Sequence, residues 1–130
     1  MIDARGIFAV ALGAAIGGVL RYVVGQIFLQ RFGAGFPYGT LFINVSGCFL
    51  IGIIAELAAT RAFGVTTTVR LFAVTGILGG YTTFSTFSLD ALTLFGDGAQ
   101  LLSLAYMAGS VILGFFASYA GFILARVAVR

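Results

Sequence analysis

Four long apolar stretches dominate the pattern of residues along this chain, and short polar turns separate them. The stretches cover about residues 6–30, 37–57, 71–95 and 98–125. Each has the roughly 20 mostly apolar residues that a helix needs to cross a bilayer. Their only charges are Arg21 in the first stretch, Glu56 at the end of the second and Asp90 in the third. The pattern predicts an all-α membrane protein in which residues 1–130 form a single domain of four transmembrane helices.

Composition excludes a soluble fold. Hydrophobic residues make up 61% of the 130 residues and charged residues only 8%, whereas a soluble domain is about half apolar and a quarter charged. The mean hydropathy of +1.15 points the same way. The loops that remain between the apolar stretches are too short to hold a soluble domain.

The net charge of +3 comes from arginine without any lysine. These arginines are scattered singly, mostly near the ends of the apolar stretches, so no nucleic acid partner is expected. With both chain ends in the cytoplasm, five arginines would lie inside and two outside, which the positive-inside rule favours. The inner group is Arg5, Arg61, Arg70, Arg126 and Arg130, and the outer group is Arg31 and Arg21.

Histidine is absent, and Cys48 is the single cysteine. The chain therefore has no intrachain disulfide and no Cys/His zinc site. Without histidine or lysine it also lacks a plausible nucleophile–base pair, so an enzyme is not expected. We interpret Cys48 as a packing residue and Glu56 as a membrane-boundary residue.

Pairs of small residues four positions apart recur along the chain. Such pairs let helix backbones approach closely, so they predict helix packing within the bundle or between subunits. The pairs are Gly13/Gly17, Gly76/Gly80, Ala105/Gly109 and Ala117/Gly121.

Polar side chains within the membrane are costly, so they usually face a bundle interior or a water-filled path. Thr40 and Asn44 share one face of the second helix, where they serve either an interhelical hydrogen bond or a pore. Ser103, Tyr106, Ser110 and Gly114 draw a polar or small stripe along the fourth helix. A stripe of hydroxyls is a hint of a permeation path.

Residues 79–88, with the sequence GGYTTFSTFS, are a poor continuous helix because two glycines precede two threonines. A broken helix frees backbone groups that can hold ions. Phe84 and Phe87 lie three residues apart, so their positive ring edges are able to face an anion together. No carboxylate sits at the centre of a span, which argues for a passive pore over a proton-coupled carrier. Arg21 is expected to reach an interface or a carboxylate, and Asp90 to sit in a vestibule or to end the third span.

Three motifs carry a family resemblance: GGVLRY at residues 17–22, PYGTLFINVSG at 37–47 and GILGGYTTFSTFS at 76–88. Together with the length and the four-span layout, they resemble the Fluc (CrcB) fluoride channels along the whole chain. The resemblance implies a passive, fluoride-selective channel of the cell (inner) membrane that exports fluoride from the cytoplasm. It also implies an antiparallel, dual-topology homodimer with two pores and a structural sodium ion at its centre.

The resemblance further assigns roles to individual residues. Main-chain carbonyls of Gly79 and Thr82 would hold the sodium ion, Phe84 and Phe87 would line the pore with their ring edges, and Arg21 would be structural. Asp90 would lie at the pore entrance. The other residues expected along the fluoride path are Asn44, Thr40, Thr83, Ser85, Thr86, Tyr106 and Ser110.

Two other functions are compatible with parts of the pattern. A four-helix drug/proton antiporter also forms antiparallel dimers, but it would need a glutamate in the first span, and residues 6–20 contain none. A non-transporting membrane scaffold would explain the glycine-rich faces, but not the break beside Phe84 and Phe87.

Overall fold

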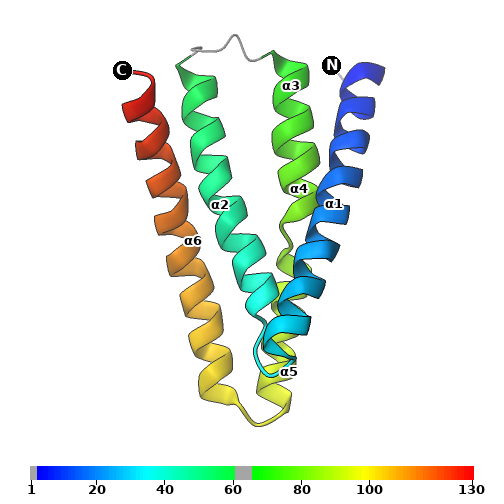
Figure 1. Ribbon diagram of the computed structural model, residues 1–130, viewed down its shortest axis with the longest axis vertical. Coiled ribbons are helices and arrows are strands. Elements are labelled where there is room, and N and C mark those ends of the chain that lie inside the picture. Colours follow the sequence, from blue (N-terminus) through cyan, green and yellow to red (C-terminus); the bar gives the residue numbers. More distant parts are fainter. Residues whose placement is uncertain (1–2, 61–65) are drawn as a thin grey trace.

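The computed structural model describes residues 3–60 and 66–130, and every regular element in these ranges is a helix. The elements are α1 (Ala4–Phe32), α2 (Tyr38–Ala59), α3 (Thr67–Arg70), the π-helix η1 (Leu71–Leu78), α4 (Gly79–Tyr81), α5 (Phe84–Gly96) and α6 (Gln100–Ala128) (Figure 1). The predicted all-α class is thereby confirmed.

Three helices, α1, α2 and α6, are long and apolar enough to cross a membrane. They match the first, second and fourth predicted spans to within three residues at each end. The third predicted span, residues 71–95, is divided into η1, α4 and α5, which follow the short α3 along the bundle (Figure 1). The π-helical stretch was not predicted, because nothing in its mostly apolar sequence distinguishes it from an α-helix.

The helix ends follow from local chemistry. The Asp3 carboxylate accepts a hydrogen bond from the Gly6 N–H at 2.7 Å and so caps α1. Gly33 ends α1 and Gly98 precedes α6, with φ of 75° and 85°. Residues other than glycine rarely adopt such positive φ values, so glycine suits both turns.

Both chain ends lie at one end of the bundle (Figure 1). Of the arginines predicted to be cytoplasmic, Arg5, Arg70, Arg126 and Arg130 belong to the ends of α1, α3 and α6 that gather there. Arg61, the fifth, lies outside the described residues.

Glycines bring the helices into close contact. A side chain at Gly13 or Gly17 would overlap the backbone of η1 and α4, and one at Gly52 would overlap the backbone of α6 at Ser118. The predicted packing role is thus confirmed for Gly13/Gly17 and for Gly76/Gly80, which face each other, and for Gly121, which faces Phe49 on α2. Gly109 differs, because a side chain there would contact nothing within 4 Å.

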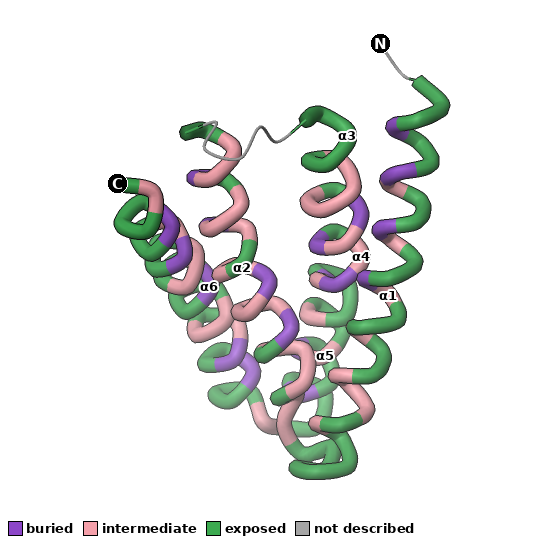
Figure 2. Tube along the Cα trace, turned by 45° about the horizontal axis from the view of Figure 1, so that its top comes forward, coloured by how far each residue is buried: buried purple, intermediate pink, exposed green. Residues whose placement is uncertain are grey.

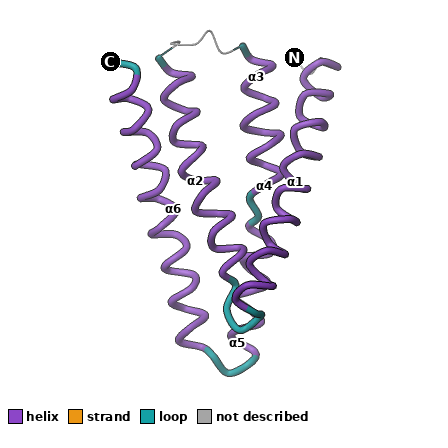
Figure 3. Tube along the Cα trace, in the orientation of Figure 1, coloured by secondary structure: helices purple, strands orange, loops and turns teal. Residues whose placement is uncertain are grey.

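The interruption after α4 lets the third segment contact two different partners. The η1 and α4 elements pack mainly on α1, whereas α5 packs mainly on α6. Figure 3 shows the short loop that separates α4 from α5 midway along the bundle. The two halves of the third segment therefore pack on different neighbours, on either side of this loop.

Buried positions face the inside of the bundle, and the outward surfaces are exposed (Figure 2). Many exposed side chains are large and apolar, for example Leu101 at 81%, Val111 at 69% and Phe115 at 67%. Water would make such a surface unfavourable, whereas lipid covers it at no cost. The chain is therefore a multi-pass membrane protein.

Candidate functional site at the broken helix

The third segment breaks at Thr82 and Thr83, which both adopt extended backbone conformations. The Thr83 hydroxyl accepts a hydrogen bond from the Thr86 N–H at 3.2 Å and caps the new helix α5. The predicted break is confirmed, but Gly79 and Gly80 remain helical. Gly80 serves packing instead, because a side chain there would overlap Ala14 on α1.

Asn44 on α2 binds the backbone of the break with both atoms of its amide. Its Nδ2 donates to the Thr83 carbonyl at 3.0 Å, and its Oδ1 accepts from the Thr83 N–H at 2.9 Å. Of the two roles predicted from spacing, the structure shows the interhelical hydrogen bond. One N–H of the Nδ2 group remains after this pairing.

The carbonyls of Gly79 and Thr82 are among those that lose their helical donors at the break. In a continuous helix the Gly79 carbonyl would accept from the Thr83 N–H, which donates to Asn44 instead. The Thr82 carbonyl would accept from the Thr86 N–H, which donates to the Thr83 hydroxyl. The two freed carbonyls belong to the residues that the motif assigned to sodium.

Arg21 on α1 donates to the carbonyl of Gly80 through Nε, at 2.8 Å, and through a terminal nitrogen. This contact corrects the expectation that Arg21 reaches an interface or a carboxylate. The guanidinium sits where α4 ends, so its charge meets the negative end of that helical segment. Arg21 thus has a structural role at the break.

A third contact at the break comes from Ser46 on α2, whose hydroxyl lies 3.0 Å from the hydroxyl of Tyr81. Sequence reasoning gave neither residue a role. Their only signal was membership of the motifs at residues 37–47 and 76–88. With Asn44, this contact ties α2 to both sides of the break.

Three aromatic rings form a line that runs from the break to α6. The Phe84 and Phe87 ring centroids are 5.5 Å apart, and those of Phe87 and Tyr106 are 5.2 Å apart. Phe84 is 79% exposed on the surface of the single chain, whereas Tyr106 is 2% exposed. The line therefore leads from the outer surface of the subunit into its interior.

The polar stripe on α6 faces inward, as predicted. The Tyr106 hydroxyl donates to the Asp90 carboxylate at 3.4 Å, and the Ser103 hydroxyl donates to the Ala91 carbonyl at 2.7 Å. The Ser110 hydroxyl is buried, and no hydrogen-bond partner is found for it among the described residues. An unpaired buried hydroxyl is available to a ligand.

A cavity of about 770 Å³ lies between α1, α2 and α5. Of the predicted site residues, it is lined by Thr40, Thr83, Thr86, Asp90 and Arg21. Asp90 lines this cavity and does not end the third span, because α5 continues to Gly96. Asp97, which sequence reasoning did not single out, also lines the cavity.

The remaining predicted residues are not among those that line this cavity. Asn44, Phe84, Phe87, Tyr106 and Ser110 do not line it, but Asn44 and Tyr106 bind Thr83 and Asp90, which do. The Ser85 hydroxyl lies 3.3 Å from that of Thr83. The structure thus connects most of the predicted residues around the break.

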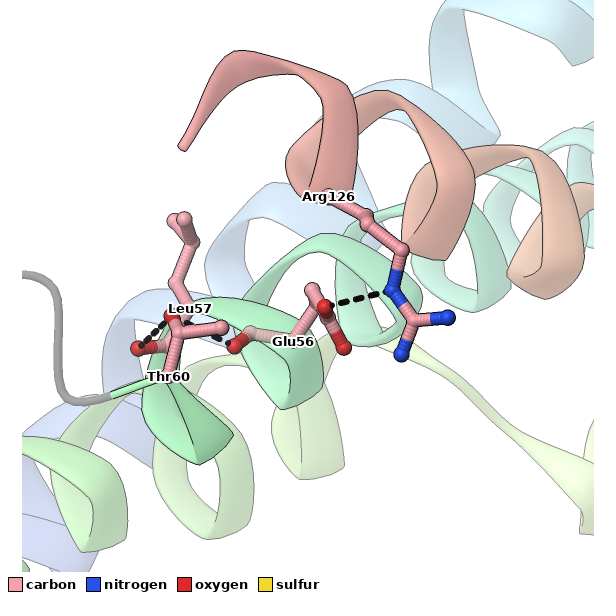
Figure 4. Close-up of polar contacts among 4 residues, drawn as sticks. All are labelled: Glu56, Leu57, Thr60 and Arg126. Carbon is pink, nitrogen blue, oxygen red and sulfur yellow. Dashed lines mark hydrogen bonds and ion pairs between the residues drawn. The ribbon is translucent and has the colours of Figure 1, made fainter. Parts of the chain in front are cut away.

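One polar pair lies away from the break, between the ends of α2 and α6. The Arg126 Nε lies 2.9 Å from Glu56 Oε1, and the Glu56 side chain is only 5% exposed (Figure 4). Arg126 also lies 4.4 Å above the Phe122 ring. The interpretation of Glu56 as a boundary residue missed this burial, because no residue spacing links positions 56 and 126.

Comparison with known proteins identifies the family. A family model described as "CrcB-like protein, Camphor Resistance (CrcB)" matches residues 8–122. A "Fluoride-specific ion channel FluC" from Rhizobium meliloti (strain 1021) is 50% identical over 123 residues, which are 95% of this chain and 98% of the relative.

Proteins of the same name from two other bacteria are also similar to this chain. The one from Nitrobacter winogradskyi is 52% identical over 121 residues, 93% of this chain and 95% of the relative. The one from Trichormus variabilis is 47% identical over 119 residues, 92% of this chain and 87% of the relative. These matches confirm the resemblance drawn from the motifs, and the chain belongs to the CrcB family.

Proposed function

We propose that this protein is a fluoride-selective, passive ion channel of the plasma membrane that lets fluoride leave the cytoplasm. It is a transport protein and not an enzyme. Relatives named as fluoride-specific ion channels match more than nine-tenths of the chain at 47–52% identity, which supports this function.

The observation that carries the proposal is that the cavity and the line of aromatic rings meet at Asp90 on α5. Asp90 belongs to both, since it lines the hydroxyl-bearing cavity and accepts a hydrogen bond from Tyr106. Tyr106 in turn continues the aromatic line of Phe84 and Phe87. A fluoride ion that passed along the cavity and the aromatic line would therefore meet hydroxyl hydrogen-bond donors and then aromatic ring edges.

This chemistry suits fluoride. The ion is small and strongly hydrated, so a pore must replace its water with hydrogen-bond donors without holding it tightly. Hydroxyls of Thr40, Thr83, Ser85, Thr86 and Ser110 supply such donors. The ring edges of Phe84 and Phe87 add a weakly positive lining, and the remaining Asn44 N–H is one further donor. Asp90 lies at the entrance.

The proposed assembly is an antiparallel, dual-topology homodimer with two pores. Phe84 is 79% exposed in the single chain, and Thr75 and Gly79 are exposed on the same broken segment. A polar surface at mid-membrane is unfavourable against lipid. A second copy would cover it and would complete the surroundings of Phe84.

A structural sodium ion is part of the proposal. Among the described residues, no cluster of three or more acidic, cysteine or histidine side chains is placed to bind a metal. The Gly79 and Thr82 carbonyls, freed from their helical donors, are oxygen ligands of the kind that a hard cation takes. Two such carbonyls from each subunit would hold the ion, whose positive charge would organise the break.

Fluoride efflux from liposomes that hold the purified protein tests the function, with chloride as the comparison ion and no proton gradient. Rapid fluoride release, little chloride release, and reduced fluoride release in Phe84→Ile and in Asn44→Asp are expected. Release that requires a proton gradient would indicate a coupled carrier. No fluoride release from well-folded protein would contradict the channel.

A further inference from the structure

The first helical turn after Asn44 carries a gap on the surface of α2, at Gly47. A Cβ built at Gly47 would overlap the Cγ2 methyl of Thr82, while its next neighbours, Tyr81 Cδ1 and Thr82 Cβ, would lie at ordinary contact distances of 3.6 and 3.7 Å. The Thr82 methyl thus occupies the space that any larger residue at position 47 would need. We name this feature the Gly47 notch.

The other atoms of Thr82 are also held. Its hydroxyl and its N–H both donate to the Leu78 carbonyl, each at 2.9 Å. With the methyl in the notch and the hydroxyl on Leu78, the side chain has one rotamer. The peptide plane that carries the freed Thr82 carbonyl also carries the Thr83 N–H, which donates to Asn44 at 2.9 Å. The contacts of Thr82 and this hydrogen bond together set the direction of the carbonyl.

We propose that Gly47 is a positioning residue, whose missing side chain seats the Thr82 methyl and thereby aims the Thr82 carbonyl and the start of α5. The inference rests on the proposed function, because it assigns Gly47 to the sodium site and to the pore that follows it. Phe84 is two residues beyond Thr82, so a shift of Thr82 moves the first pore ring too.

Other glycines of the bundle act differently. Gly52 and Gly121 face helical backbone, and Gly109 faces open space. Among the described glycines, Gly47 alone faces a side chain of the two threonines at the break. Its contact is therefore specific to the one methyl group of Thr82. Removing that methyl group should compensate for a side chain added at position 47, which makes the contact testable.

The test is a double-mutant cycle of Gly47→Ala and Thr82→Ser in the full-length protein. Serine keeps the hydroxyl bond to Leu78 but lacks the methyl that alanine would strike. Gly109→Ala is the matched control, because it makes the same change at a position on α6 where a Cβ would have no neighbour within 4 Å. The first measurement is the sodium concentration that produces half of the sodium-dependent rise in the unfolding midpoint in detergent. The second is fluoride efflux from liposomes.

Overpacking by one methyl group shifts an equilibrium by about one order of magnitude or more. Gly47→Ala is therefore expected to need at least about tenfold more sodium than wild type and to slow fluoride efflux. The double variant is expected to return to within about threefold of Thr82→Ser alone. A purely structural contact would lower the unfolding midpoint without changing the sodium requirement.

Two results would overturn the inference. One is a Gly47→Ala protein that matches Gly109→Ala in sodium requirement and efflux. The other is a double variant no better than Gly47→Ala. If Gly47→Ala fails to fold, folding of the double variant supports the notch, and failure of both contradicts it.

The unfolding midpoint in potassium, without sodium or fluoride, separates this inference from the proposed function. If wild type neither releases fluoride nor responds to sodium, the proposed function fails. The cycle in potassium then still reports on the notch: rescue of Gly47→Ala by Thr82→Ser supports the seating of the methyl, and additive losses contradict it.

Discussion

The side-chain amide of Asn44 replaces, for Thr83, the hydrogen bonds that a continuous helix would have supplied. It donates to the Thr83 carbonyl at 3.0 Å and accepts from the Thr83 N–H at 2.9 Å. Only a side chain with a donor and an acceptor side by side makes both bonds. Asn44 therefore holds the break open and leaves the Gly79 carbonyl without its helical partner.

Asn44→Asp is expected to destabilise the protein and to abolish most fluoride efflux. The carboxylate still accepts from the Thr83 N–H, but it places a second oxygen against the Thr83 carbonyl and leaves that acceptor without a donor. An unsatisfied buried group costs about 1–3 kcal/mol. The unfolding midpoint in detergent measures the loss.

The pH dependence of stability provides the control for Asn44→Asp. A protonated carboxyl donates again, so stability of Asn44→Asp relative to wild type should recover as the pH falls. Asn44→Ala lacks both bonds and should show no such recovery. If the two variants respond alike to pH, the pairing with Thr83 is not what Asn44 contributes.

Asn44 also shows how far the sequence leads. Its spacing from Thr40 predicts a polar position facing the interior, because polar side chains in lipid need partners. Its partner is not predictable, since the residues that leave the helix are set by tertiary contacts. Gly79 and Gly80 have the lowest helix propensity in the segment, yet close packing of Gly80 against Ala14 keeps them helical.

The contacts of Arg21 and Glu56 were not predicted for the same reason, because they also depend on tertiary structure. The four spans follow from local apolar length, which needs no partner. By contrast, the Gly80 carbonyl that Arg21 binds is 59 residues away in the sequence, and the Arg126 that Glu56 binds is 70 residues away. Single residues at such separations leave no periodic signal. Only the family motifs at residues 37–47 and 76–88 linked the candidate residues of α2 with those of the broken segment in advance.

The pair of Glu56 and Arg126 predicts an asymmetric response to mutation. The Glu56 side chain is 5% exposed and the Arg126 side chain is 46% exposed. Removing the arginine therefore leaves a buried carboxylate without its positively charged partner. Arg126→Ala is expected to cost about 1–3 kcal/mol. Glu56→Gln is expected to cost less than about 1 kcal/mol, because water and the Phe122 ring still solvate Arg126.

Unfolding midpoints of the two variants, measured side by side, check this order. Equal losses in both variants would contradict the argument from burial.

Phe84→Ile is expected to reduce fluoride efflux while leaving the fold intact. Isoleucine keeps an apolar side chain at a position that is 79% exposed in the single chain, but it removes the positive ring edge. Aromatic edge interactions are worth about 0.5–1.5 kcal/mol, so a loss of up to about tenfold in rate is expected.

Phe115→Ile is the matched control, because Phe115 is also exposed at 67% but lies on α6, outside the cavity and the aromatic line. Efflux through this variant should equal that of wild type. If both substitutions slow fluoride equally, the effect reflects bilayer packing and not the ring edge.

Asp97 is expected to slow the approach of fluoride. It is exposed and lines the cavity with Asp90 and Arg21, so its negative charge repels an anion that arrives from water. Asp97→Asn should raise fluoride efflux by about two- to threefold at low ionic strength. The gain should vanish near 1 M salt, where the screening length falls to about 3 Å.

Asp3→Asn is the comparison for Asp97→Asn. It removes the same charge outside the cavity, and asparagine replaces aspartate as a cap of α1. Efflux measured across a salt series should rise only for the Asp97 variant. A gain that persists at high salt, or that also appears in Asp3→Asn, would show that Asp97 acts through the fold or the membrane surface and not through the field at the cavity.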